Sequence, residues 1–244
     1  MGRCFHLWTE TLRASNGPFG TALAYLVHHH SIMQVHSLST HPKRSRTHRV
    51  LFLRKEGETL QFLSTSQDTR GALSEMIFTI PAGGTPPPMH LHPKQHEEVQ
   101  VLAGSMDLRL NGRRMQVSAG ETISIPRGVA HTFGNASQEV PLVAKVSFSP
   151  GLNIEWYFTQ LACSAIRNGG SWQDVPWLEA GTIHYALRNE YRLAWWPAWM
   201  QRLFFGTLTL MAKTTGAIKN IRPLSLCGLR ALKRPAYYTL GLYS

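Results

Sequence analysis

Two stretches of the chain decide its fold: Gly84-Thr-Pro-Pro-Pro-Met-His90-Leu-His92-Pro-Lys-Gln-His-Glu97-Glu-Val-Gln-Val-Leu-Ala-Gly104 and Gly120-Glu-Thr-Ile-Ser-Ile-Pro126-Arg-Gly128-Val-Ala-His131-Thr-Phe-Gly-Asn135. The first has the pattern G-x5-H-x-H-x4-E-x6-G and the second has G-x5-P-x-G-x2-H-x3-N. Residues 105–119 separate them. Both stretches place histidine or glutamate among glycines and prolines, the residues that set tight turns.

This pair of stretches resembles the two conserved motifs of the cupin superfamily, in its single-domain form, over roughly residues 58–150. All ten fixed positions agree, and agreement at ten positions by chance is negligible because each residue type has a frequency of a few per cent. The resemblance implies a small double-stranded β-helix, or jelly roll. It also implies one metal ion bound by His90, His92, Glu97 and His131.

The residues support such a site independently of the family. His90 and His92 are two positions apart in an extended segment, so both imidazoles face the same side of a strand. The three prolines before them forbid a helix. Glu97 opens the next strand, and His131 arrives from a separate one. Neutral imidazoles with one carboxylate suit Fe, Mn, Ni, Co, Zn or Cu and do not suit Ca or Mg. Four protein ligands leave one or two coordination positions for water or substrate.

Neighbouring residues offer alternatives to this ligand set. A one-residue shift of the strand would turn Glu98 inward in place of Glu97. The spacing to Gly104 favours Glu97. His96 is expected in the connecting turn, facing solvent. The run of histidines at 28–30 resembles a metal-binding tract by composition alone.

Short runs of strand-forming residues from Thr59 onward predict an all-β domain. Segments 59–64, 73–80 and 142–148 are rich in strand formers and bounded by turn residues. Asn111-Gly112, between alternating apolar and polar residues, predicts a hairpin. At least eight strands are expected, closed into a jelly-roll barrel. We therefore predict a basic, disordered extension at 1–50, a cupin-like barrel at 51–150, a helical extension at 151–217 and a basic tail at 218–244.

The charge of the chain lies outside the predicted barrel. The formal net charge is +11, with +5 in residues 1–50, 0 in 51–150, −1 in 151–200 and +7 in 201–244. Nucleic-acid binding would need a folded basic face with aromatic residues or a reading helix, and the sequence predicts neither. Cys4, Cys163 and Cys227 form no disulfide framework, so a reducing compartment, the cytoplasm, is expected. A transit peptide is the alternative interpretation of the N-terminal extension.

The segment after Pro150 changes to helical periodicity. A helix is expected at 153–167, ending before Gly169-Gly170, and a second helical region at about 185–217. The second region contains twenty mostly apolar residues, but Arg202 near their centre argues against a membrane-spanning helix. We expect it to pack on the barrel or across a two-fold interface, giving a homodimer. Peripheral attachment to anionic lipid is the alternative.

The function beyond metal binding depends on the residues that surround the ligands. The side chains expected to point inward form an apolar substrate pocket: Met76, Phe78, Met106, Leu108, Ile125 and Phe133. Phosphate recognition needs inward cations or hydroxyls, which this set lacks. An apolar pocket beside an open metal position favours a dioxygenase-like oxidoreductase acting on a small organic substrate. The alternatives are a non-catalytic ligand-binding or sensing module and a sugar isomerase or epimerase, since one fold hosts many functions. The sequence identifies no general base apart from the ligands.

Overall fold

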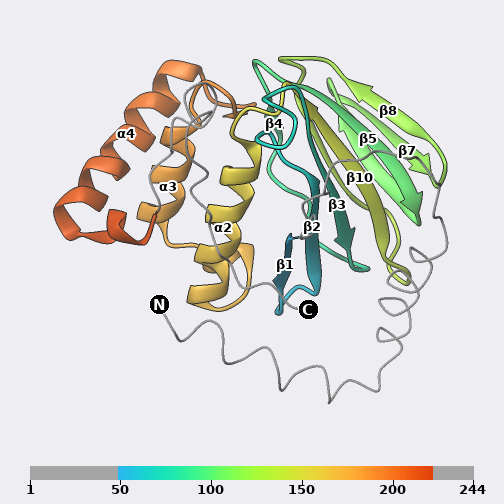
Figure 1. Ribbon diagram of the computed structural model, residues 1–244, viewed down its shortest axis with the longest axis horizontal. Coiled ribbons are helices and arrows are strands. Elements are labelled where there is room, and N and C mark those ends of the chain that lie inside the picture. The colour runs from blue at the N-terminus through green and yellow to red at the C-terminus, as the bar shows by residue number, and fades with distance from the viewer. Residues whose placement is uncertain (1–48, 222–244) are drawn as a thin grey trace, which may run out of the picture. The chain divides into compact units, whose positions relative to one another are not determined.

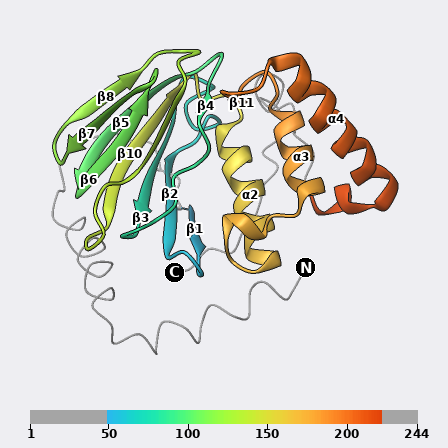
Figure 2. The ribbon, with the colours of Figure 1, turned by 180° about the vertical axis from the view of Figure 1, so that it is seen from behind.

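The computed structural model describes residues 49–221, so the N-terminal extension 1–48, the tail 222–244, Cys4, Cys227 and the histidine run at 28–30 lie outside the described residues. The strands form two antiparallel sheets (Figures 1 and 2). The first sheet has the order β1 (Arg49–Leu53), β2 (Glu58–Ser64), β3 (Ser74–Ile80), β10 (Leu142–Ser149), β5 (His96–Ala103) and β8 (Thr122–Ile125). The second sheet has the order β11 (Arg192–Leu193), β4 (His90–Leu91), β9 (His131–Asn135), β6 (Ser105–Leu110) and β7 (Arg113–Ser118).

The strands predicted at 59–64, 73–80 and 142–148 correspond to β2, β3 and β10. The predicted hairpin is confirmed as β6–β7, with Leu110 opposite Arg113. Asn111 and Gly112 have φ angles of 49° and 78°. Positive φ at both central residues is the conformation that an Asn-Gly turn favours. The sequence analysis missed β1, which pairs with β2 along the edge of the first sheet.

The predicted β-rich fold of antiparallel strands is present, but the predicted closed barrel is not. Among residues 49–221 the hydrogen bonds join the strands into two separate sheets, not one continuous ring. Apolar side chains between the sheets form the core, and several are fully buried, including Leu60, Val99, Met106 and Leu108. The two sheets are therefore held together by packing and not by a shared ladder of hydrogen bonds.

Three helices follow β10 in the chain, with β11 between the second and the third of them. Helix α2 (Ile154–Asn168) lies next to β1, α3 (Trp177–Ala186) packs on α2, and α4 (Ala198–Thr215) packs on α3 (Figures 1 and 2). Two short 3-10 helices, η2 (Trp172–Asp174) and η3 (Ala217–Asn220), follow α2 and α4. The helix predicted at 153–167 is confirmed as α2, and Gly169 caps its C-terminus.

The second predicted helical region, 185–217, is confirmed in part, because it is not helical throughout. It contains the end of α3, the strand β11 and the whole of α4. Pro197 directly precedes α4. A proline disfavours helical geometry at the residue before it, so the helix begins only after Pro197. Helix α3 itself begins at Trp177, upstream of the predicted region.

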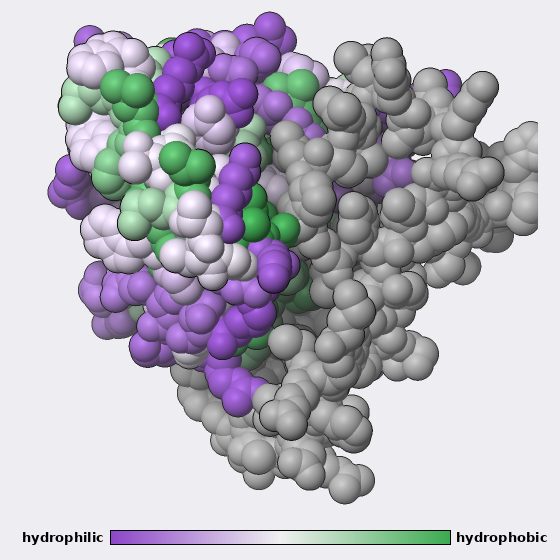
Figure 3. Space-filling model, turned by 90° about the vertical axis from the view of Figure 1, so that its left-hand side faces the viewer, coloured by the Kyte–Doolittle hydropathy of each residue, from purple (hydrophilic) through white to green (hydrophobic). Residues whose placement is uncertain are grey.

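Helix α4 directs small and polar residues towards the protein. Its buried residues are Gln201, Thr209 and Ala212. Its exposed side carries Trp199, Leu203 and Leu210, which are 63–65% exposed. Figure 3 shows hydrophobic and weakly polar residues running along the face that this helix turns outward. No helix within residues 49–221 is long and apolar enough to cross a membrane.

Candidate metal centre

The four side chains that the sequence predicts as metal ligands lie together at one end of the two sheets. His90 on β4 is directly opposite His131 on β9 in the second sheet. His92 follows β4, and Glu97 comes from β5 of the first sheet. One ligand atom from each residue lies within 4.8 Å of the others, and all four residues are buried. The cluster therefore joins the two sheets through residues from both sequence motifs.

Backbone carbonyl groups orient two of the imidazoles. His90 Nδ1 lies 2.8 Å from the Pro88 carbonyl oxygen, and His131 Nδ1 lies 2.9 Å from that of Val129. A carbonyl accepts only, so Nδ1 carries a proton in both rings, and Nε2 is the nitrogen that remains to bind a metal ion. Metal-bound histidines commonly hold their ring orientation in this way. The motifs are also joined directly, because Gly128 N–H donates to the His92 carbonyl at 2.9 Å.

Burial and mutual charge set the protonation of the cluster. Burial, with the charges of His131 and His92, lowers the pKa of His90 to about 3. Burial also lowers the pKa of His92 to about 4, although Glu97 opposes the shift. Burial tends to raise the pKa of Glu97, but the three imidazoles outweigh it and lower the pKa to about 2. Burial opposes protonation of His131, but the adjacent Glu97 outweighs it and raises the pKa of His131. An ionised carboxylate among imidazoles is a donor set that suits a divalent transition metal, and metal binding releases any proton held at a ligand nitrogen.

Unsatisfied atoms at the centre of the cluster provide a test of whether a metal fits. Glu97 Oε2 lies 2.8 Å from His131 Nε2 and 3.4 Å from His92 Nε2. Despite the short separation, neither Glu97 Oε2 nor His131 Nε2 makes a hydrogen bond of acceptable geometry. Buried polar atoms without partners are costly. A cation between them would satisfy both atoms, so the residues fit a bound metal ion.

The nearby residues that offered alternatives face away from the cluster. Glu97 is 2% exposed, whereas Glu98 is exposed to solvent, so the strand register turns Glu97 inward as predicted. His96 Nε2 lies 2.9 Å from the Ser124 hydroxyl at the surface. The prediction that His96 lies in the connecting turn is wrong, because it is the first residue of β5. It is half-buried and takes no part in the cluster.

The six residues predicted to line a pocket are all buried in the core between the sheets, with exposures of 0–6%. The rings of Phe78 and Phe133 meet edge to face, with centroids 6.4 Å apart. Phe133 also lines a groove of about 240 Å³ with Pro86, Asp107, Arg109, Thr132, Gly134 and Asn135. The structure therefore brings Phe133 to this groove and places Met76, Met106, Leu108 and Ile125 in close-packed core.

Tyr191 is a further residue of this centre, and the sequence analysis missed it. Its ring stacks on His90 with centroids 4.9 Å apart and an angle of 22°, and meets the edge of His92 at 5.6 Å. It directly precedes β11, where Leu193 pairs with His90 of β4. The helical extension thus adds a strand beside the ligand-bearing strand. No local signal in the sequence indicates this pairing, because β11 is two residues long.

Aromatic and imidazole rings continue from Tyr191 into the helices. Tyr157 on α2 stacks on Tyr191 with centroids 4.9 Å apart, and the Tyr157 hydroxyl lies 3.3 Å from His184 Nε2. His184 Nδ1 lies 2.8 Å from the Ala180 carbonyl, so Nδ1 is the donor and Nε2 accepts from Tyr157. Burial and then the charge of Glu97 raise the pKa of Tyr191, although Tyr157 opposes the shift, so the hydroxyl stays protonated.

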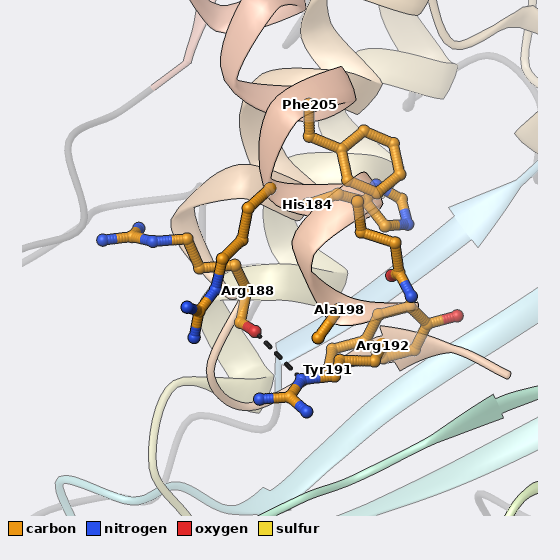
Figure 4. Close-up of a pocket in the computed structure, with 8 residues that line it drawn as sticks. His184, Arg188, Tyr191, Arg192, Ala198 and Phe205 are labelled. Carbon is orange, nitrogen blue, oxygen red and sulfur yellow. Dashed lines mark hydrogen bonds between the residues drawn. The ribbon is translucent and has the colours of Figure 1, made fainter. Parts of the chain in front are cut away.

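A small hollow lies beside this chain of rings, between the end of α3 and the start of α4 (Figure 4). Its volume, about 10 Å³, suits roughly one water molecule. His184, Tyr191, Gln201 and Phe205 line it together with three arginines, Arg188, Arg192 and Arg202. In Figure 4 the Arg192 side chain donates to the Arg188 carbonyl, which fixes one guanidinium group at the rim.

Comparisons with known proteins agree with the geometry. Residues 76–148 match the family model of the cupin domain. The chain is 32% identical over 74 residues to quercetin 2,3-dioxygenase of Bacillus subtilis, an alignment that covers 30% of this chain and 22% of that protein. It is 29% identical over 121 residues to the probable oxidoreductase virH of Hypocrea virens, covering 46% of this chain and 55% of that protein. The chain thus matches about a fifth and about half of the lengths of these curated relatives.

Solved structures are also similar over part of the chain. An RmlC-like cupin from Shewanella frigidimarina is 18% identical, with a TM-score of 0.37, and the alignment covers 46% of this chain and 92% of that chain.

Proposed function

Residues 76–148 form a cupin domain, and on that premise we propose that this chain binds one divalent transition metal ion and uses it to oxidise a small organic substrate with O2. The ion is Fe, Mn, Ni, Zn, Co or Cu, and the ligands are His90, His92, Glu97 and His131. The observation that carries the proposal is the convergence of these four buried donors, among them Glu97 Oε2 and His131 Nε2, which lack hydrogen-bond partners.

When bound, the metal supplies an open coordination position at which O2 and an oxidisable group can be brought together. The protein residues hold that position in a dry environment. His90 and His131 are oriented by the Pro88 and Val129 carbonyls, and Tyr191 covers the ring of His90. Because Tyr191 is protonated, its hydroxyl can donate a hydrogen bond. It is the chain's candidate for orienting a polar group of the substrate.

The reaction class rests on the chemical surroundings and on partial similarity to the two curated relatives. Aromatic side chains surround the ligands. The ring of Phe148, for example, contacts His92 edge to face, with centroids 5.3 Å apart. Such surroundings favour a flat phenolic or dicarbonyl compound over a sugar phosphate. When both atoms of O2 are added to one substrate, the substrate supplies all of the electrons, so no external reductant is needed. These considerations support our proposal of a dioxygenase-type reaction in preference to isomerisation.

The test measures O2 consumption by protein loaded separately with each of the six metals, against a panel of phenolic, dicarbonyl and thiol compounds. We expect turnover with at least one pairing of metal and compound. Glu97→Gln should reduce that turnover by about a hundredfold or more, since loss of a charged ligand weakens metal binding and removes a negative charge from the metal site. Glu98→Gln is the matched control, because Glu98 is adjacent but exposed, and it should retain wild-type turnover.

A different result would favour the non-catalytic interpretation. A binding or sensing module would gain thermal stability with a ligand, by mass action, and consume no O2 with any metal. Interconversion of a sugar without O2 uptake would instead support an isomerase or epimerase. Either result would contradict the oxidation while leaving the metal centre intact.

A further inference from the structure

Helix α4 carries apolar residues on the side that faces away from the protein as well as on the side that packs. It packs on α3 and β11, and its buried residues are Gln201, Thr209 and Ala212. Gln201 is fixed there by three hydrogen bonds, accepting from Leu193 N and donating to the Leu193 and Trp196 carbonyls. Phe205 also stacks on His184 of α3, and Leu208 lies close to Gly181. The orientation of α4 is therefore set by these apolar contacts together with the hydrogen bonds of Gln201.

The outward face is large and apolar. We define the α4 face as the exposed apolar side chains of this helix: Trp199, Met200, Leu203, Phe204, Leu210 and Met211, which are 38–65% exposed. Trp195, just before the helix, is 56% exposed and extends the face at its N-terminal end. Figure 3 shows this face with hydrophilic residues around it. Contiguous exposed apolar surface of this kind marks an interaction site.

The charges beside the α4 face are all positive. Arg202 and Lys213 are exposed on α4, and Arg188 and Arg192 lie with Arg202 around the hollow at its N-terminal end (Figure 4). No Asp or Glu follows Glu190 anywhere in the sequence, whereas eight Lys or Arg residues do. A partner that complements this region must therefore offer an apolar interior for the exposed apolar side chains and negative charges at its surface for the basic residues.

We propose that the α4 face is a docking surface for an anionic lipid bilayer. Helices that lie in a membrane interface combine tryptophan, phenylalanine and leucine on one side with basic residues beside them. Tryptophan prefers the headgroup level, where Trp195 and Trp199 would lie. The arginines around the hollow would meet phosphate groups, because guanidinium pairs with phosphate in a bidentate manner. Docking would hold the metal centre, through Tyr191 and β11, close to the membrane.

A second copy of the chain fits the same face less well. Two α4 faces brought together would bring Arg202 and Lys213 of both copies near each other. Neither α4 nor the sequence after it carries a carboxylate to balance them. Like charges at a buried boundary cost free energy. The charge distribution thus favours lipid over self-association.

The experiment is sedimentation of the full chain with vesicles of equal parts phosphatidylglycerol and phosphatidylcholine, compared with phosphatidylcholine alone. We expect binding to the anionic vesicles that weakens at least about tenfold between about 0.15 M and 0.5 M salt, since the attraction is screened. The triple variant Trp199→Ser/Leu203→Ser/Leu210→Ser should lose the binding. Its matched control replaces three exposed apolar residues elsewhere, Val50→Ser/Leu102→Ser/Val140→Ser, and should bind as the wild type does.

Each opposite result would overturn the proposal. The full chain failing to bind anionic vesicles at low salt is one such result, and equal binding by the triple variant is another. Analytical ultracentrifugation tests whether a second copy of the chain binds the α4 face instead. The face would belong to a second copy if the wild type were a dimer without vesicle binding and the triple variant were a folded monomer. Circular dichroism on both triple variants verifies that each is folded.

Discussion

The rings of His90 and His131 owe their orientation to carbonyl groups two residues earlier in the chain, at Pro88 and Val129. Each carbonyl lies two residues from the histidine that it orients, so the same short stretch of sequence contains both the ligand and the group that orients it. The sequence therefore predicted the four-residue cluster, including the choice of Glu97 over Glu98. Tyr191 could not be predicted in this way, because its contact with His90 depends on a strand pairing between distant parts of the chain.

The contribution of Tyr191 can be measured by substitution. Tyr191→Leu removes the ring that stacks on His90 and should weaken metal binding by about tenfold to a hundredfold, as loss of an outer partner of a ligand commonly does. Tyr191→Phe keeps the ring and should bind metal within about threefold of the wild type. Competition with a chromophoric chelator measures both affinities. Tyr185→Leu, which changes a tyrosine of α3 that contacts Arg188, is the control.

A Tyr191→Leu protein that is folded and binds metal as tightly as the wild type would contradict a positioning role for the ring. Weaker binding by Tyr185→Leu as well would attribute the effect to the helices in general.

At the scale of elements, local patterns predicted the strands and hairpin well, because alternation and turn residues report directly on backbone conformation. The region 185–217 was predicted only in part because β11 exists through its pairing with β4, which local periodicity does not encode. The helical extension is also tied to the first sheet by polar contacts. Glu58 on β2 accepts from Trp172 Nε1 at 2.9 Å, and Glu56 accepts from Trp172 N at 3.0 Å.

This contact between β2 and η2 predicts a pH-dependent stability. Burial and the nearby Glu56 raise the pKa of Glu58 to about 7, although the Trp172 hydrogen bond opposes the shift. In the unfolded chain Glu58 loses its proton near pH 4.5, whereas in the folded protein it keeps the proton up to about pH 7. The free energy of unfolding therefore falls as pH rises from about 4.5 to about 7 and then levels off. Glu58→Gln should remove this part of the slope and stabilise the protein above pH 7 by at most about 3 kcal/mol.

Urea unfolding at intervals from about pH 5 to pH 8 measures the difference between Glu58→Gln and the wild type. Glu139→Gln, at an exposed carboxylate, should keep the wild-type slope. Parallel pH profiles for Glu58→Gln and the wild type would contradict the assignment of this proton to Glu58.

At the scale of the whole molecule, the two sheets meet at the metal centre, and the helices extend from one edge of the first sheet. The overall β fold followed from the sequence because two motifs and their spacing constrain the strands around the ligands. The outward orientation of the apolar side of α4 did not, because apolar periodicity gives the width of a helix face and not the direction in which it points. Here the three hydrogen bonds of Gln201 and the packing of Phe205 on His184 hold the helix in that direction.

The central claim is that His90, His92, Glu97 and His131 bind one metal ion. Its most direct test is elemental analysis of the full chain after loading with excess divalent metal and exhaustive dialysis. The wild type and the His96→Ala control, which changes a histidine outside the cluster, should each retain about one ion per chain. The His90→Ala/His92→Ala variant, verified as folded, should retain less than about a tenth of that amount. Equal metal content in this variant and the wild type would contradict the claim.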